Sequence, residues 1–201
     1  KETYAPGGAS NVAVNASALN AKVFMVGITG EDNARNVLLQ ELKNYGINVE
    51  GIFTDNDKPT IQKVRIMGRG QQLLRVDYEK KEHMHKEIEQ AMIALLNKMI
   101  KEVDVIVISD YAKGAITKGL SSKLIEISRD NNKAIIVDPK PEHLDFYSNV
   151  TLITPNNAEA SAMSHIEDGS DNSISEMGLK LMKYLNTNIL ITRGEKGVSL
   201  F

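Results

Sequence analysis

Short runs of β-branched residues alternate with amphipathic stretches along most of the chain. The runs at 22–28, 103–109, 134–138, 150–154 and 188–192 are typical of strands that a parallel sheet buries on both faces. Apolar residues recur at helical spacing between them, in the segments 9–19, 33–45, 86–100, 117–129 and 174–185. This alternation predicts an α/β fold with a central, mostly parallel sheet and helices on both faces.

The segment from Gly46 to Tyr78 breaks this alternation, because no helix fits it. It holds three runs, 47–53, 60–67 and 72–77, and Gly68-Arg69-Gly70 separates the last two. Glycine and a polar residue between two alternating runs indicate a β-hairpin. We expect a small antiparallel sheet at about 47–78, inserted as a lid or an oligomer surface. An edge extension of the main sheet is the alternative.

Composition narrows the class of protein. With 201 residues and 42% hydrophobic residues, the chain can bury one full core. A net charge of −2 argues against a general nucleic-acid binder, and no apolar run is long enough to span a membrane. The absence of cysteine excludes disulfides, a thiol nucleophile and a zinc–thiolate site, and it fits a cytoplasmic protein.

Polar loops follow most of the predicted strands, at 27–32, 109–114, 138–140, 154–159 and 192–197. Carboxyl ends of parallel strands share one edge of a sheet, where ligands bind. Asn156 and Glu159 are three residues apart, so on a first helical turn they share a face and suit hydrated Mg²⁺. Each loop also has a structural interpretation: a capping box at Asn156, a helix cap at Asp32 or a plain turn.

Two further features suggest ligands. Gly7-Gly8-Ala9-Ser10-Asn11 opens a helix with free N–H groups and an amide suited to a sugar hydroxyl, although a glycine turn explains it as well. The hairpin carries a basic cluster, Lys63, Arg65, Arg69 and Arg75, beside Gln72 and Asp77. Guanidinium groups match phosphate, but a solvated face is the alternative. The four histidines (His83, His85, His143 and His165) show no zinc-ligand spacing and are expected at the surface.

Together these motifs resemble the ribokinase-like (PfkB) family of sugar kinases. The resemblance rests on Gly7 to Ala13 followed by Gly30-Glu31-Asp32, on Asn156-x-x-Glu159, and on Thr192-Arg193-Gly194-x-x-Gly197. Asn20 departs from the family, which has Gly or Ser there. The runs 71–77, 109–114, 138–140 and 154–156 are similar to family members that phosphorylate a heptose 7-phosphate. The resemblance covers essentially the whole chain.

The resemblance implies a function and a set of site residues. It implies transfer of phosphate from ATP, with Mg²⁺, to the anomeric hydroxyl of D-glycero-D-manno-heptose 7-phosphate. The implied sugar-phosphate site comprises Gly7, Gly8, Asn11, Lys63, Arg65, Arg69, Gln72, Arg75, Asp77, Asp110 and Lys113. The implied ATP site comprises Lys140, Asn156, Asn157, Glu159, Thr192, Arg193, Gly194 and Gly197. Of these, Asn156 and Glu159 are the implied metal ligands, directly or through water.

The resemblance also implies that parts of the family's kinase domain are missing from residues 1–201. The family's catalytic base is an Asp in a Gly-Ala-Gly-Asp motif, which is absent here, so no catalytic residue is assigned and the base is expected downstream of Phe201. The apolar run from Val198 to Phe201 is interpreted as a strand at which the chain has been cut. An N-terminal strand with a substrate-binding Asp would precede Lys1.

We therefore expect residues 1–201 to be an internal fragment of one kinase domain, inactive by itself, whose parent forms a homodimer through the lid. Two alternatives remain. The first is another PfkB sugar kinase with a different substrate. The second is a binding domain of the same fold that does not catalyse a reaction.

Overall fold

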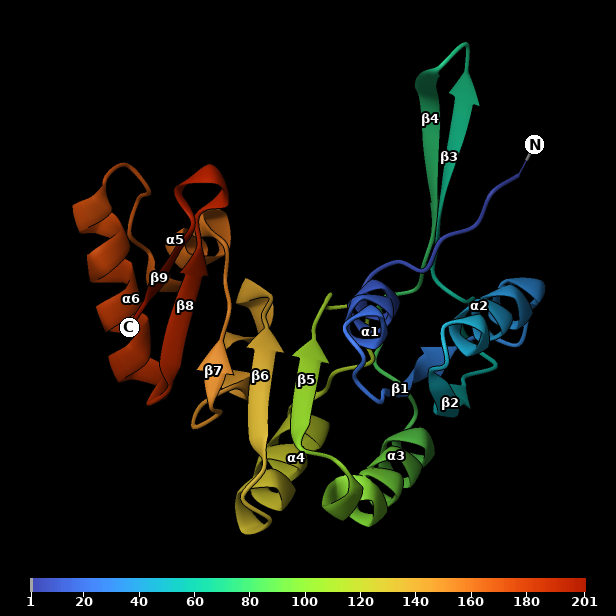
Figure 1. The fold of residues 1–201 in the computed structure, drawn as a ribbon, viewed down its shortest axis with the longest axis horizontal. Helices are drawn as coiled ribbons and strands as arrows, with labels where there is room; N and C mark the ends of the chain where they lie inside the picture. The colour runs from blue at the N-terminus through green and yellow to red at the C-terminus, as the bar shows by residue number, and fades with distance from the viewer. Residues whose placement is uncertain (1) are drawn as a thin grey trace. The chain divides into compact units, whose positions relative to one another are not determined.

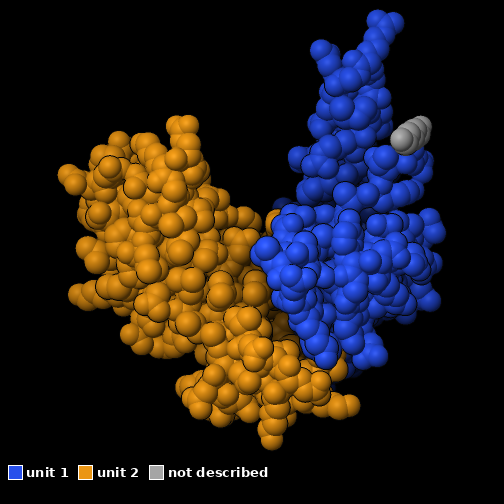
Figure 2. Space-filling view, viewed as in Figure 1, with its two compact units in different colours: residues 1–92, 113–115 blue, residues 93–112, 116–201 orange. Residues whose placement is uncertain are grey.

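The computed structural model describes residues 2–201, which divide into two compact units (Figure 2). Unit 1 comprises residues 1–92 and 113–115, and unit 2 comprises residues 93–112 and 116–201. Each unit has its own cluster of buried apolar side chains. Within the described residues, no helix has the length and apolar character needed to cross a membrane.

Unit 1 contains a parallel pair of strands, β1 (Phe24–Thr29) and β2 (Asn48–Thr54), connected by helix α2 (Asn33–Asn44). Helix α1 (Ala9–Ala18) precedes β1, and α3 (Lys86–Met99) follows the hairpin described below and continues into unit 2, which begins at Ile93. The expectation that 47–53 joins an antiparallel sheet is wrong, because β2 pairs with β1 in parallel. A helix of this length is the usual crossover between parallel neighbours, so β2 completes a βαβ unit.

The segment predicted as a lid contains a two-stranded hairpin, β3 (Gln62–Gly68) and β4 (Gln71–Tyr78), which extends away from β1 and β2 (Figure 1). Arg69 and Gly70 form its turn with φ values of 50° and 80°. Positive φ at both central residues matches the right-handed twist of hairpin strands. The predicted hairpin and its turn are confirmed, although the antiparallel part is shorter than 47–78.

The Gly30-Glu31-Asp32 motif anchors the chain where it enters the hairpin. The Asp32 carboxylate caps α2 by accepting a hydrogen bond from the Arg35 amide (2.9 Å), and its other oxygen accepts one from the Thr60 amide (2.8 Å). The Gly30 amide donates to the Thr60 hydroxyl (3.1 Å). The helix-cap interpretation of Asp32 is therefore confirmed.

Gly30→Ala is expected to destabilise unit 1. A Cβ at Gly30 would overlap the backbone of Lys58, Pro59 and Thr60, and that backbone cannot move without breaking the bonds to Asp32. We expect a loss of about 2 kcal/mol in unfolding free energy, measured by chemical denaturation. Gly27→Ala is the matched control, since a Cβ there has no neighbour within 4 Å. Equal stability of both variants would contradict the packing argument.

Unit 2 is built on one sheet, in the order β5-β6-β7-β8-β9. Strands β5 (Val105–Ser109), β6 (Ala134–Asp138), β7 (Leu152–Ile153) and β8 (Asn188–Thr192) are parallel, and β9 (Val198–Leu200) is antiparallel to β8. The helical elements of this unit are η1 (Ile100–Glu102), α4 (Lys118–Asp130), η2 (Pro141–Phe146), α5 (Asn157–Ser164), α6 (Asp171–Leu185) and η3 (Gly194–Lys196). The predicted mostly parallel sheet flanked by helices is confirmed for the strands from β5 to β8 (Figure 1). The predicted strand at 22–28 instead belongs to the separate pair β1–β2 of unit 1.

The core of unit 2 explains why its strands are so clear in the sequence. Val137, Ile153, Ile189 and Ile191 are fully buried, and α6 contributes Met177, Leu181 and Leu185 to the same cluster. Helix α4 packs against β6, and α6 packs against β8 and β9. This packing fixes the ends of four parallel strands at one edge of the sheet.

Candidate active site

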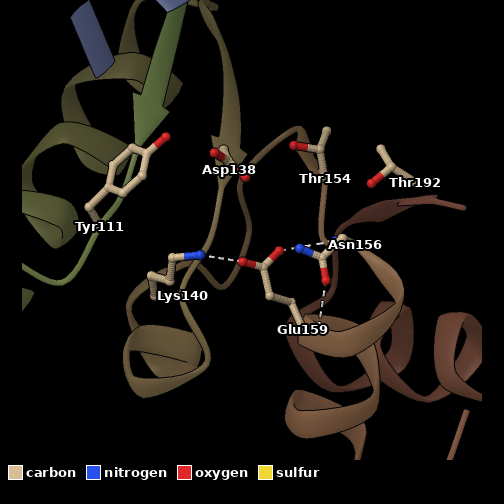
Figure 3. A pocket seen from close by; sticks show the side chains of 7 residues that line it. All are labelled: Tyr111, Asp138, Lys140, Thr154, Asn156, Glu159 and Thr192. Carbon is tan, nitrogen blue, oxygen red and sulfur yellow. Dashed lines mark hydrogen bonds and ion pairs between the residues drawn. The ribbon is translucent and has the colours of Figure 1, made fainter. Parts of the chain in front are cut away.

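Loops at the carboxyl ends of β5, β6, β7 and β8 surround a pocket of about 380 Å³ (Figure 3). Seven residues line it: Tyr111, Asp138, Lys140, Thr154, Asn156, Glu159 and Thr192. The predicted gathering of polar loops at one sheet edge is thus confirmed for these four strands. Four predicted ATP-site residues lie here: Lys140, Asn156, Glu159 and Thr192. Tyr111, Asp138 and Thr154 were not among the predicted ligands.

Asn156 and Glu159 form a capping box at the start of α5. The Asn156 side-chain oxygen accepts a hydrogen bond from the Glu159 amide (2.9 Å), and Glu159 Oε2 accepts one from the Asn156 amide (3.0 Å). The structural interpretation of this pair is therefore correct. The interpretation of the pair as Mg²⁺ ligands also stands, because both side chains line the pocket and the capping box holds the Glu159 carboxylate in place.

Lys140 connects the loop after β6 with α5. Its ammonium forms an ion pair with Glu159 Oε1 and lies 5.8 Å from the centre of the Tyr111 ring (Figure 3). The hydrogen bond to Glu159 raises the pKa of Lys140, so the amine is protonated at neutral pH. The pocket therefore holds a permanent cation suited to phosphate oxygens.

Asp138 is the second carboxylate of the pocket. Burial raises the pKa of Asp138, and the negative charge of Glu159 raises it further. Two carboxylates and an amide oxygen around one pocket are a hard oxygen set, and Mg²⁺ takes such ligands while keeping several waters. A divalent cation would also relieve the repulsion between Asp138 and Glu159. The residues present therefore fit magnesium.

Asp138→Asn is expected to stabilise the fold at neutral pH. The pKa of Asp138 is higher in the folded than in the unfolded protein, so its ionisation above that pKa costs stability that the amide does not lose. Below the unfolded pKa both states are protonated and the cost vanishes. We expect a melting temperature about 1–3 °C higher at pH 7, after allowing for solvent screening, and a smaller gap toward pH 4. A gap that widens on acidification would contradict this.

The other predicted ATP-site residues lie outside the pocket lining. Arg193 pairs with Asp171 of α6 and donates to the Ser199 hydroxyl (3.3 Å), which ties the loop after β8 to its neighbours. Gly194 and Gly197 shape that turn with φ values of 60° and 78°. Asn157 is half-buried, and its side-chain oxygen has no hydrogen-bond partner in the described structure. Their assignment to ATP stays a prediction.

Phe201 belongs to the sheet and the core of unit 2 and does not line the pocket. Its backbone exchanges two hydrogen bonds with Ile189 of β8, one donated to the Ile189 carbonyl (2.8 Å) and one accepted from the Ile189 amide (2.9 Å). Its ring packs on Gly178 of α6 and against the core of unit 2. The predicted apolar strand at Val198–Phe201 is thus confirmed, with Phe201 extending the pairing of β9. A catalytic base downstream of Phe201 stays a prediction.

Asp110 is a buried carboxylate with hydrogen-bond partners in three other residues. One carboxylate oxygen accepts from the Tyr147 hydroxyl and pairs with His143 Nδ1, both at 2.6 Å, and the other accepts from the Ala112 amide (2.8 Å). Asp110 is 1% exposed, so this placement favours a structural role over the predicted contact with substrate. The expectation that all four histidines lie at the surface is wrong for His143, which is buried and stacks on Phe146.

The basic cluster of the hairpin lies mostly on one face. Lys63 faces Asp77, and Arg65 faces Arg75, across the two strands. Asp77 pairs with Lys63 (2.9 Å) and with Arg75 (2.9 Å), and the hydrogen bond from Lys63 is the main cause that lowers the pKa of Asp77. Two like charges directly opposite each other destabilise a sheet unless an anion compensates them. Arg65 and Arg75 are therefore candidate ligands for an anion.

The remaining predicted sugar-site residues have the following places. Gly7 and Gly8 precede α1, with Gly8 at φ 54°, and Asn11 is exposed on its first turn. Arg69 is in the hairpin turn, and Gln72 is exposed on β4. Lys113 forms a 2.6 Å ion pair with Glu79, which lowers the pKa of that carboxyl.

Comparison with known proteins places the chain in a family. Residues 1–201 match the pfkB family of carbohydrate kinases. A bifunctional protein HldE from Desulfatibacillum aliphaticivorans is 38% identical over 100% of this chain and 41% of its own length. One from Gluconobacter oxydans is 37% identical over 98% of this chain and 41% of its length. The chain thus spans about two fifths of these relatives.

Solved structures share the fold. Arabidopsis thaliana ribokinase, complexed with ribose and ATP, superposes with a TM-score of 0.75 at 20% identity, covering 100% of this chain and 64% of that one. Escherichia coli phosphofructokinase-2 with fructose-6-phosphate gives 0.73 at 17% identity, covering 97% and 64%. Since the family match extends over every residue, this chain belongs to the pfkB family of carbohydrate kinases.

Proposed function

We propose that this chain is part of a kinase that transfers phosphate from ATP, with Mg²⁺, to the anomeric hydroxyl of D-glycero-D-manno-heptose 7-phosphate. The product is the 1,7-bisphosphate, in ADP-heptose synthesis for the lipopolysaccharide core. The observation that carries the proposal is the pocket at the ends of β5–β8, where Lys140 and Glu159 meet. The similarity to bifunctional HldE proteins supports the choice of sugar.

The pocket has the groups that phosphoryl transfer requires. Such reactions depend on positioning and on neutralising the charge of the phosphates more than on covalent help from the protein. Lys140 offers an ammonium, and Asp138, Asn156 and Glu159 offer oxygens for Mg²⁺. When bound, that ion would screen the phosphate oxygens of ATP. Asn157, Thr192, Arg193, Gly194 and Gly197 complete the proposed nucleotide site.

The hairpin supports a substrate that already carries a phosphate. Arg65 and Arg75 face each other with one carboxylate beside them, so the face has excess positive charge. A 7-phosphate would neutralise it, whereas ribose would not. Gly7, Gly8 and Asn11 are proposed to hold the sugar hydroxyls, and Lys63, Arg69, Gln72, Asp77 and Lys113 are proposed to complete the site.

The opposite face of the hairpin supports a second proposal, a homodimer formed through the lid. Val64, Ile66, Leu74 and Tyr78 share this face, and each is between 39% and 53% exposed. Pairing two such faces would bury an apolar surface that is costly to leave in water. Sedimentation equilibrium of the full-length protein tests this, and a strictly monomeric protein at micromolar concentration would refute it.

Phosphorus NMR of the reaction tests the proposed chemistry. With full-length protein, ATP, MgCl₂ and the heptose 7-phosphate, we expect one new sugar phosphate signal coupled to the anomeric proton, and none without MgCl₂. The same assay on residues 1–201 alone tests the expectation of inactivity that rests on the missing Gly-Ala-Gly-Asp motif. Phosphate on another carbon would favour a different sugar kinase of the family, and no transfer would favour a binding domain.

A further inference from the structure

The ion pair between Lys140 and Glu159 has a consequence for how ligands enter the pocket. Both oxygens of Glu159 are engaged: Oε1 by the Lys140 ammonium and Oε2 by the Asn156 amide. The second bond belongs to the capping box and cannot be given up without loosening the start of α5. Lys140 is therefore the partner that must leave if Glu159 is to serve another cation.

The exposure of the two side chains also differs, and Lys140 is the more accessible partner. The Glu159 side chain is 11% exposed and held by α5, whereas the Lys140 side chain is 32% exposed at the end of a flexible stem. The Glu159 pair, the nearby charge of Asp138 and the weaker contact with the Tyr111 ring hold the ammonium in place. Lys140 can thus change partners without any change in the backbone.

We propose that Lys140 exchanges partners when ligands bind. In the ligand-free protein it neutralises Glu159, and when the nucleotide phosphates arrive it moves to them and leaves Glu159 to the metal ion. We call this arrangement a latch. The inference rests on the proposed function. With two carboxylates and one ammonium, the pocket has a net charge of −1 before ligands bind. A metal ion alone competes with Lys140 for Glu159, whereas phosphates draw Lys140 away. Metal and nucleotide therefore bind cooperatively through this one side chain.

The test measures metal and nucleotide binding separately in the full-length protein. Lys140→Met removes the charge and keeps the length of the side chain. By calorimetry we expect MnCl₂ alone to bind about fivefold or more tightly than to wild type, and ADP without metal to bind about fivefold or more weakly. Lys140→Arg keeps the charge and should leave both affinities near wild type. Lys140→Gln is the second neutral variant if Lys140→Met folds poorly.

Loss of a purely structural ion pair would weaken the binding of both ligands. The latch instead predicts tighter Mn²⁺ binding and weaker ADP binding, so the opposite signs of the two changes distinguish it. Mn²⁺ affinity in Lys140→Met equal to or below that of wild type would overturn the inference. Tighter Mn²⁺ with unchanged ADP affinity would overturn the transfer to phosphates. If wild type binds neither ADP nor Mn²⁺, the proposed function itself fails. If wild type binds both and the variant is unchanged, only the latch fails.

Discussion

Glu159→Gln is expected to lower kcat/KM of the full-length kinase about 10³-fold, equivalent to ~4 kcal/mol of transition-state stabilisation. The amide oxygen can still accept the hydrogen bond from the Asn156 amide, so the start of α5 is kept. The carboxylate charge is lost, and with it the proposed hold on the metal and the counter-charge of Lys140. The result would place Glu159 in the chemistry rather than in the fold.

Steady-state rates at rising MgCl₂ measure this effect. We expect the defect to shrink at high metal concentration, because the variant has lost affinity for the ion. Glu126→Gln is the matched control, since Glu126 pairs with Lys123 on the exposed surface of α4 and does not line the pocket. A variant at position 159 within about threefold of wild type would contradict a catalytic part for this carboxylate.

Arg75→Ala is expected to raise KM for the heptose 7-phosphate about 100-fold, or ~2.7 kcal/mol, with little change in KM for ATP. Arg75 faces Arg65 on the charged face of the hairpin, where the proposed 7-phosphate binds. Charge-assisted bonds from a guanidinium to phosphate are among the stronger polar contacts. The loss should therefore be confined to the sugar phosphate.

Three comparisons sharpen this prediction. Arg75→Ala also frees Asp77, so Arg65→Ala, which leaves the Lys63–Asp77 and Arg75–Asp77 pairs intact, should give a similar rise in KM. Arg129→Ala, at an exposed position of α4, should change nothing. Heptose without the 7-phosphate should be used equally poorly by wild type and Arg75→Ala. An unchanged KM in both hairpin variants would refute the phosphate site.

The strands of unit 2 could be predicted from the sequence because most of their residues are apolar and belong to the core. Runs such as 134–138 and 188–192 lie between helices and neighbouring strands, so most of their positions are apolar or small and the pattern is plain. The segment 47–53 was harder, because an alternating run does not specify its partner. Its parallel pairing with β1 depends on α2 lying between them, which is a property of topology rather than of the run itself.

The pocket was predictable only in part, for a similar reason. Lys140 and Glu159 follow β6 and β7, so strand order brings them to one edge. The burial of Asp110 depends on His143 and Tyr147, which are 33 and 37 residues away, and no local pattern indicates such partners. Tyr111 could have been predicted as a pocket residue from one feature of the sequence, its position two residues after the end of β5.

The choice of sugar tests the account most directly. We would measure kcat/KM of the full-length protein for D-glycero-D-manno-heptose 7-phosphate, fructose 6-phosphate and ribose under identical ATP and MgCl₂ concentrations. The charged hairpin predicts a preference of about 100-fold or more for the heptose 7-phosphate over ribose. The similarity to bifunctional HldE proteins predicts a preference over fructose 6-phosphate as well. A higher kcat/KM for fructose 6-phosphate or ribose would contradict it.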